Sequence, residues 1–209
     1  MTNLLKILFL WLAYFVFIFN LIKYGVFLIF IFKIKRKVIF FVVSFIKLYL
    51  GIMVKIKNPY LAVDGYNCFG CSPYNHDGLK MNFMEEGNEV ICKWVPQSQF
   101  VGWKNILHGG IQATLMDEIA GWVVSVKVKT AGVTSRLNVR YLKAVEVGLG
   151  DIIIKGKLIE MRRNIALIQT QLFDGENNLC AEADIQYFTF NAETASLKYN
   201  YPGHDSFYE

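Results

Sequence analysis

The segment from Ile111 to Val128 constrains the fold more than any other part of the chain. Its apolar residues follow a helical spacing and cover most of the helix circumference rather than one stripe. A helix with this pattern is buried on nearly all sides. It nevertheless contains Asp117 and Glu118, and a buried carboxylate is costly unless it is paired. The sequence therefore predicts a buried central helix whose acids have structural partners or chemistry to perform.

A His-Gly-Gly sequence, His108 to Gly110, opens this helix. Glycines let the backbone approach a ligand closely, and the first turn of a helix leaves N–H groups free. Together with the helix dipole, these donors suit a carbonyl oxygen that becomes negative during acyl transfer. Asp117, two to three turns further on, is a candidate general base or nucleophile. The alternative is a glycine-rich helix cap with a salt-bridged Asp-Glu pair at a subunit contact.

Strand-like patterns surround the helix on both sides. Two precede it, and four follow after a break at Thr130–Gly132. Asp174–Asn178 predicts the turn between the last two strands. The expected strands are 79–85, 90–95, 133–142, 151–161, 164–173 and 179–190.

This order predicts an α+β domain in which an antiparallel sheet wraps around one long central helix. Such a sheet has exposed edges, and pairing them across a dimer is one way to cover them.

The first 52 residues differ in composition from the rest of the chain. They contain seven Lys or Arg and no Asp or Glu, whereas residues 53–209 carry a net formal charge of −2. The remainder therefore lacks the basic stripe that is typical of nucleic-acid-binding proteins. We expect an apolar, basic segment over 1–52, a globular domain over 53–209, and no nucleic-acid partner.

Two explanations of residues 1–52 remain open. Apolar runs at 7–32 and 38–53 flank the basic cluster 33–37; the first is long enough to span a bilayer and the second is marginal. This pattern predicts a domain anchored in the membrane through residues 7–53, with the cluster on the cytoplasmic side. The composition is also typical of translated A/T-rich non-coding DNA upstream of a start at Met53. That explanation predicts a cytoplasmic domain without a membrane partner.

The four cysteines are Cys68, Cys71, Cys92 and Cys180, and we interpret them as reduced thiols. Cys68 and Cys71, followed by His76, resemble half of a zinc site, but a second pair at the required spacing is missing from the sequence. A structured loop before the first strand is therefore the expected role, with no metal site.

The combination of His108-Gly109-Gly110, Leu115 and Asp117 resembles the hotdog-fold acyl-CoA thioesterases, specifically the phenylacetate-degradation (PaaI-like) branch. Further similarity lies in Cys68–Cys71, Asn75, Gly78-Leu79, Ala131–Thr134 and Asn138–Tyr141. The resemblance covers about residues 58–190. It implies a hotdog fold, an acyl-CoA substrate, no cofactor, and a homodimer or homotetramer.

The resemblance also implies roles for individual residues. The backbone N–H of Gly109 would polarise the thioester carbonyl, and Asp117 would activate water or attack directly across a dimer interface. His108 would orient the turn or the thioester, or would cap the helix. The candidate substrate-binding residues are Gly110, Gln112, Thr134 and Asn105. We expect Glu118, which points away from Asp117 on the helix, to pair with a basic residue.

Alternatives of other classes remain. A non-catalytic acyl-CoA-binding hotdog module would bind without turnover, although such a module has no need of the buried Asp117. A hydratase or dehydratase on the same fold would set its catalytic His and acid at a different spacing from the one found here.

Overall fold

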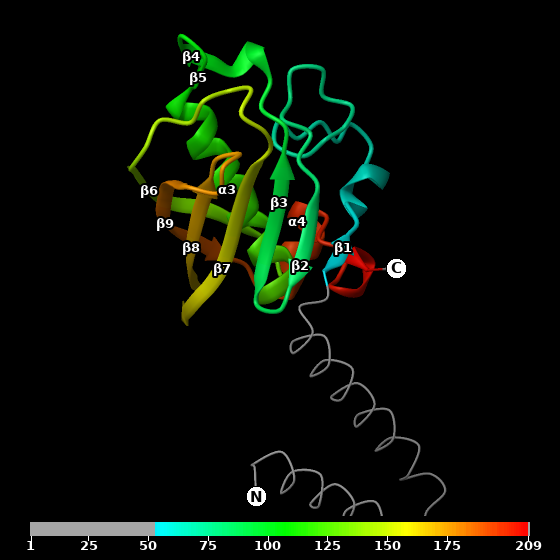
Figure 1. Cartoon of the computed structure of the whole chain (residues 1–209). Helices are drawn as coiled ribbons and strands as arrows, with labels where there is room; N and C mark the ends of the chain where they lie inside the picture. Colours follow the sequence, from blue (N-terminus) through cyan, green and yellow to red (C-terminus); the bar gives the residue numbers. More distant parts are fainter. Residues whose placement is uncertain (1–52, 209) are drawn as a thin grey trace, which may run out of the picture. The chain divides into compact units, whose positions relative to one another are not determined.

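The computed structural model describes residues 53–208. The predicted N-terminal segment, residues 1–52, lies outside the described residues, and so does Glu209. The described part contains a seven-stranded antiparallel sheet with one long helix against it (Figure 1). The architecture expected from the sequence, an antiparallel sheet around a central helix, is confirmed. Among residues 53–208, no helix is long and apolar enough to cross a membrane.

The sheet has the strand order β1-β2-β3-β7-β8-β9-β6, and all neighbouring strands pair antiparallel. The edges are therefore the short β1 and the ten-residue β6. A separate two-stranded sheet joins β4 to β5. The bounds are β1 Val54–Ile56, β2 Phe83–Glu86, β3 Glu89–Trp94, β4 Val101–Trp103, β5 Ile106–Leu107, β6 Gly132–Tyr141, β7 Ile152–Arg162, β8 Ile165–Phe173 and β9 Leu179–Thr189.

The central helix α3 spans Gly109–Val123 and continues into a π-helical turn, η3, over Val124–Val128. Its buried side chains include Leu115, Met116 and Ile119, each fully enclosed between the helix and the sheet. Lys129 ends the helix in the left-handed conformation, with φ 66°. The predicted helix was therefore correct in position, and it ends at Val128 as expected.

The expected strand at residues 79–85 is only partly correct, because β2 begins at Phe83. Leu79 and Met81 are buried as their alternation predicts, but their backbone amides bond to the loop containing the two cysteines. Leu79 N–H donates to the Phe69 carbonyl at 2.7 Å, and Met81 N–H donates to the Gly70 carbonyl at 2.9 Å. The alternating pattern thus reflects burial beside a loop rather than pairing in the sheet.

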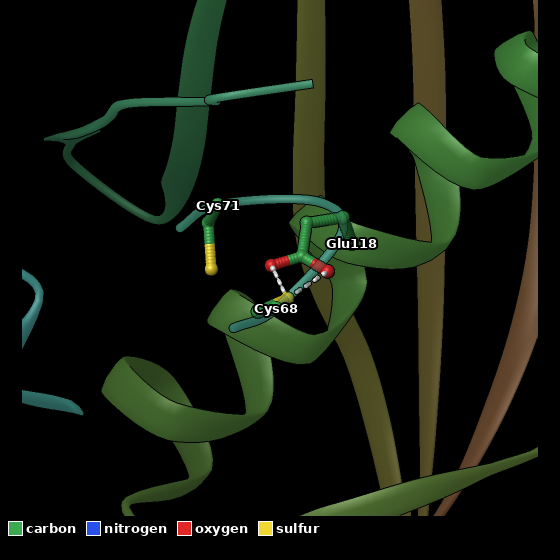
Figure 2. A group of neighbouring side chains, drawn as sticks. All are labelled: Cys68, Cys71 and Glu118. Atoms are coloured by element: carbon green, nitrogen blue, oxygen red, sulfur yellow. Dashed lines mark hydrogen bonds between the residues drawn. The ribbon is translucent and has the colours of Figure 1, made fainter. Parts of the chain in front are cut away.

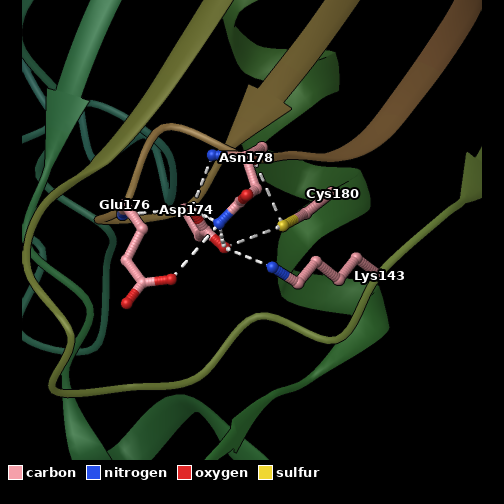
Figure 3. A network of polar contacts seen from close by, with 5 residues as sticks. All are labelled: Lys143, Asp174, Glu176, Asn178 and Cys180. Carbon is pink, nitrogen blue, oxygen red and sulfur yellow. Dashed lines mark hydrogen bonds and ion pairs between the residues drawn. The ribbon is translucent and has the colours of Figure 1, made fainter.

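The turn between β8 and β9 is the one predicted, and Asp174 organises it (Figure 3). The Asp174 carboxylate accepts hydrogen bonds from the Glu176 amide at 3.1 Å and from the Asn178 amide at 2.8 Å. The Cys180 thiol and the Lys143 ammonium approach its second oxygen. Burial raises the pKa of Asp174, but these donors outweigh that effect and hold it below its usual range.

Several short elements were not predicted from the sequence. They include β1, the β4–β5 hairpin, and the helix α4 at Ala192–Tyr199. The α4 helix is capped by Asn191, whose side chain accepts from the Thr194 amide at 2.8 Å. Because α4 buries only Ala195, it lacks the apolar periodicity that reveals a helix in a sequence.

Candidate functional site

The first turn of α3 is organised by His108, which caps the helix. Its Nδ1 atom accepts a hydrogen bond from the Gly110 amide at 2.9 Å, and its carbonyl accepts from the Ile111 and Gln112 amides. The capping role considered for His108 is thus present. The Gly109 amide, by contrast, has no hydrogen-bond acceptor among residues 53–208. It therefore remains available to an external oxygen atom.

Tyr141, near the end of β6, closes over the same turn. Its hydroxyl donates to the Gly109 carbonyl at 2.7 Å, and a side chain at Gly109 would lie 3.5 Å from the Tyr141 ring. The Thr114 hydroxyl donates to the Gly110 carbonyl at 2.8 Å. These contacts fix the turn while leaving His108 and Gly110 exposed.

Asp117 is held by two hydroxyl groups on the neighbouring edge of the sheet. Thr134 Oγ1, on β6, donates to Asp117 Oδ1 at 2.8 Å. The Tyr187 hydroxyl, on β9, lies 2.9 Å from the same oxygen and 2.8 Å from the Asp117 carbonyl. Thr134 and Tyr187 are direct partners in the β6–β9 register, which explains why they converge on one carboxylate. Sequence reasoning identified Thr134 but missed Tyr187.

A cavity of about 440 Å³ lies beside this carboxylate. Thr134 and Tyr187 line it on one side, and Trp122 and Glu118 line it from the helix. The remaining lining is mostly aromatic or apolar and includes Tyr60, Tyr66, Val63, Ala131 and Val133. A cavity with apolar walls and a few polar groups is the usual form of a small-molecule site.

The predicted basic partner of Glu118 is not found among residues 53–208. Within the described part of the chain, no Lys, Arg or His forms an ion pair with it. Its oxygens instead accept from the Trp122 indole N–H at 3.1 Å and from the Cys68 thiol at 3.6 Å. Burial and the nearby Cys68 raise the pKa of Glu118 to about 7.

Of the four predicted substrate-binding residues, only Thr134 lines the cavity, and Gly110, Gln112 and Asn105 do not. Gln112 is buried, and its amide nitrogen donates to the Leu107 carbonyl at 3.0 Å, which ties the helix to β5. Asn105 forms the exposed turn of the β4–β5 hairpin with φ 59°, and its carbonyl accepts from the Val147 amide at 2.7 Å. The structure thus brings Asp117 and Thr134 together but does not place Gln112 or Asn105 beside them.

The antiparallel sheet with one long helix against it is a hotdog-type thioesterase fold. Residues 104–181 match the family model described as Thioesterase superfamily. The match spans the whole of α3 and the strands β6, β7 and β8. The fold is therefore of the hotdog type, and residues 104–181 resemble the Thioesterase superfamily.

Individual relatives are similar to this chain in sequence or in fold. A Saccharolobus solfataricus protein named as a proposed esterase is 27% identical over 126 residues, which cover 58% of this chain and 81% of the relative. A Haemophilus influenzae thioesterase has a similar structure, with a TM-score of 0.52 and 21% sequence identity. The similarity covers 58% of this chain and 85% of the thioesterase. A Streptococcus mutans protein bound to acetyl CoA is also similar in structure, with a TM-score of 0.51 and 20% sequence identity. The similarity covers 62% of this chain and 97% of that protein.

Proposed function

We propose that this chain hydrolyses acyl-CoA thioesters to the free acid and CoA. The observation that carries the proposal is the pairing of a free amide at the start of α3 with a carboxylate oriented by two hydroxyls later on the same helix. The match to the Thioesterase superfamily supports this reaction class. The similar fold of a protein bound to acetyl CoA supports the choice of CoA. The motif residues around Cys68–Cys71 and His108–Gly110 support membership of the PaaI-like branch.

The Gly109 amide would polarise the thioester carbonyl. It lies at the helix N-terminus, where the backbone dipoles favour negative charge. One donor of this kind typically lowers the barrier of acyl transfer by about 2.7–4 kcal/mol. His108 holds the turn through the Gly110 amide, so its role in the proposal is to orient the Gly109 donor rather than to act as a base.

Asp117 would activate the attacking water. Thr134 and Tyr187 both bond to its Oδ1 atom, so the carboxylate is fixed in one orientation and Oδ2 remains available to a water molecule. Thr134 thereby serves the reaction through Asp117. A substrate acyl group would occupy the adjacent cavity, beside Trp122 and Tyr187.

The two groups belong to different subunits in this proposal. Gly109 and Asp117 are eight residues apart on α3, so they lie about 12 Å apart along the helix axis. Both must come within about 3 Å of the reacting atoms, which one helix cannot achieve. Two antiparallel copies of α3 would bring Gly109 of one subunit beside Asp117 of the other.

The edge strand β6 supports such a homodimer. Nearly all of its ten residues are exposed, including Val133, Leu137 and Tyr141. A long, partly apolar edge strand is a template for pairing with a second copy. The same strand carries Thr134, so pairing there would join two sites. A homotetramer would be built from two such dimers.

Thiol release from short, long and aromatic acyl-CoAs, measured with the purified full-length chain, tests the activity. Asp117→Asn should lower kcat by at least two orders of magnitude, because it removes the base but keeps the acceptor for Thr134. Asp64→Asn, in an exposed loop, is the matched control and should keep full activity.

Two outcomes would overturn the proposal. A folded parent that releases CoA from none of the thioesters is not a thioesterase. If it still binds acyl-CoA, and Asp117→Asn leaves that binding unchanged, the chain is a non-catalytic binding module. An Asp117→Asn variant as active as the parent would remove Asp117 from the mechanism.

A further inference from the structure

Three potential metal ligands from distant parts of the sequence converge beside the cavity. Cys68 and Cys71 come from the loop before β2, and Glu118 comes from the middle of α3. Their ligand atoms all lie within 4.8 Å of one another. Figure 2 shows the Cys68 sulfur facing both Glu118 oxygens, and the Cys71 sulfur lies near the same carboxylate. His76, which the sequence placed near these cysteines, is instead exposed and paired with Asp77.

The spacing fits tetrahedral coordination. With Zn–S about 2.3 Å and Zn–O about 2.0 Å, two ligands at the tetrahedral angle lie about 3.5–3.8 Å apart. The Cys68 sulfur is 3.6 Å from each carboxylate oxygen of Glu118. Small side-chain rotations within the 4.8 Å cluster would bring Cys71 to the same separation. Two thiolates and a carboxylate are ligands that suit Zn²⁺.

Each of the two sulfurs is also oriented by donors of the protein. The backbone amides of Gly70 and Cys71 approach the Cys68 sulfur and, after the Cys71 thiol, help to lower the pKa of Cys68. The Tyr66 hydroxyl lies 2.9 Å from the Cys71 sulfur, and Asn58 Nδ2 donates to that sulfur at 3.7 Å. Hydrogen bonds of this kind orient metal ligands.

The Glu118 carboxylate is fixed in the same way. The Trp122 indole N–H donates to it at 3.1 Å. On the opposite side, Gly70 leaves space for it, because a Cβ atom at Gly70 would lie 2.3 Å from the Glu118 carboxyl carbon. The loop therefore closes directly over a carboxylate that has no cationic partner among residues 53–208. Desolvating a carboxylate without a cation has a cost even where it is only partly buried, and a metal ion would supply the missing positive charge.

We propose that Cys68, Cys71 and Glu118 bind a thiolate-preferring divalent cation, Zn²⁺, which clamps the 68–71 loop to α3. On binding, the thiols and any protonated carboxyl release their protons to solvent and the oxidation state of the metal is unchanged. A fourth ligand, water or a group entering from the cavity, would complete the tetrahedron. The site is separate from Asp117, so the proposal does not depend on thioesterase activity.

Titration of the metal-stripped, reduced full-length chain with Zn²⁺, against a chromophoric chelator, tests this proposal. We expect one Zn²⁺ per chain and an increase in Tm on binding. Cys68→Ser and Cys71→Ser should each weaken binding at least a hundredfold, and Glu118→Gln about tenfold or more. Cys180→Ser is the matched control, because Cys180 is buried at the β8–β9 turn and outside the cluster. It should bind as the parent does.

Two further measurements use only the parent, so they test the proposal even if the variants do not fold. Co²⁺ added to the parent should give the thiolate-to-cobalt charge-transfer band that marks sulfur ligation. Zn²⁺ should protect two of the four thiols of the parent from a thiol reagent. The first 52 residues contain no Cys, His, Asp or Glu, so they contribute no competing side-chain ligand. Absence of stoichiometric binding, or equal Zn²⁺ affinity in a folded Cys68→Ser variant, would overturn the proposal.

Discussion

Tyr187 shows how a single hydroxyl group can determine the geometry of a site. It is buried, and it bonds to both the carboxylate and the carbonyl of Asp117. Burial and the charge of Asp117 raise its pKa well above the usual range, so the hydroxyl keeps its proton and remains a donor at all physiological pH values. The Asp117 side chain is thereby held against the sheet edge.

We expect Tyr187→Phe to lower kcat/KM about tenfold. Losing one hydrogen bond of about 1–1.5 kcal/mol corresponds to that factor. Tyr74→Phe is the control, because Tyr74 is 74% exposed and does not line the cavity. Steady-state kinetics on the best acyl-CoA substrate would decide the matter. Equal kinetics for Tyr187→Phe and the parent would show that Asp117 is oriented without this hydroxyl.

The sequence predicted only part of this residue-level picture. Asp117 was recognisable because an acid within an apolar helix is unusual. Tyr187 was not, since an aromatic residue in a buried strand is ordinary and its hydroxyl partner depends on the register of β6 against β9. Glu118 was assigned a basic partner by the usual rule for buried acids, whereas the folded chain provides thiols from a loop fifty residues away.

At the level of elements, an ion pair joins β2 to the end of the central helix. Lys127, in η3, contacts Glu85 of β2 and also donates to the Gly87 carbonyl at 2.7 Å. The Tyr208 hydroxyl donates to the other Glu85 oxygen at 2.6 Å. Burial raises the pKa of Glu85, but the hydrogen bonds from Lys127 and Tyr208 outweigh this effect and hold the pKa below its usual range.

This contact makes stability depend on pH. A carboxyl group whose pKa is lower in the folded state than in the unfolded state stabilises the protein fully when the pH lies above its unfolded-state pKa. This stabilisation is lost as the pH falls through the folded-state pKa. We expect Glu85→Gln to lower the free energy of unfolding by about 1–3 kcal/mol at pH 7. The difference from the parent should shrink once the pH falls below about 4.5.

Urea unfolding at several pH values measures this effect. Glu86→Gln is the matched control, because the neighbouring Glu86 forms no ion pair within residues 53–208. A Glu85→Gln deficit that stays constant between pH 7 and pH 3 would show that shape, rather than charge, explains the contribution of Glu85.

The helices and strands that could be predicted from the sequence were those with a regular spacing of apolar residues. The central helix and five of the sheet strands appear within one residue or so of their expected limits. The β4–β5 hairpin, β1 and α4 are short and gain their order from neighbours rather than from an apolar pattern. Likewise, Leu79–Asn82 alternates like a strand but bonds to the 68–71 loop, which only the tertiary structure reveals.

At the scale of the whole molecule, the proposed site is complete only in a dimer, and β6 is the strand through which the copies would pair. Leu137 lies opposite the buried Ile185 in the β6–β9 register. It therefore projects toward the helix side of the sheet, yet it remains 37% exposed. An apolar side chain on the inner face that is still exposed is expected where a second subunit packs.

Leu137→Lys places a charge in the contact between subunits. It should therefore halve the molecular mass in solution and reduce thioesterase activity by at least tenfold. Activity should recover partly at high protein concentration, where mass action restores the dimer. Leu197→Lys is the control, because Leu197 on α4 is 76% exposed, and it should change neither mass nor activity. Light scattering and kinetics on the same samples link the two readouts. A Leu137→Lys variant that is monomeric but fully active would mean that one chain supplies both the amide and the base. The assignment of Gly109 and Asp117 to a site shared between two subunits would then be wrong.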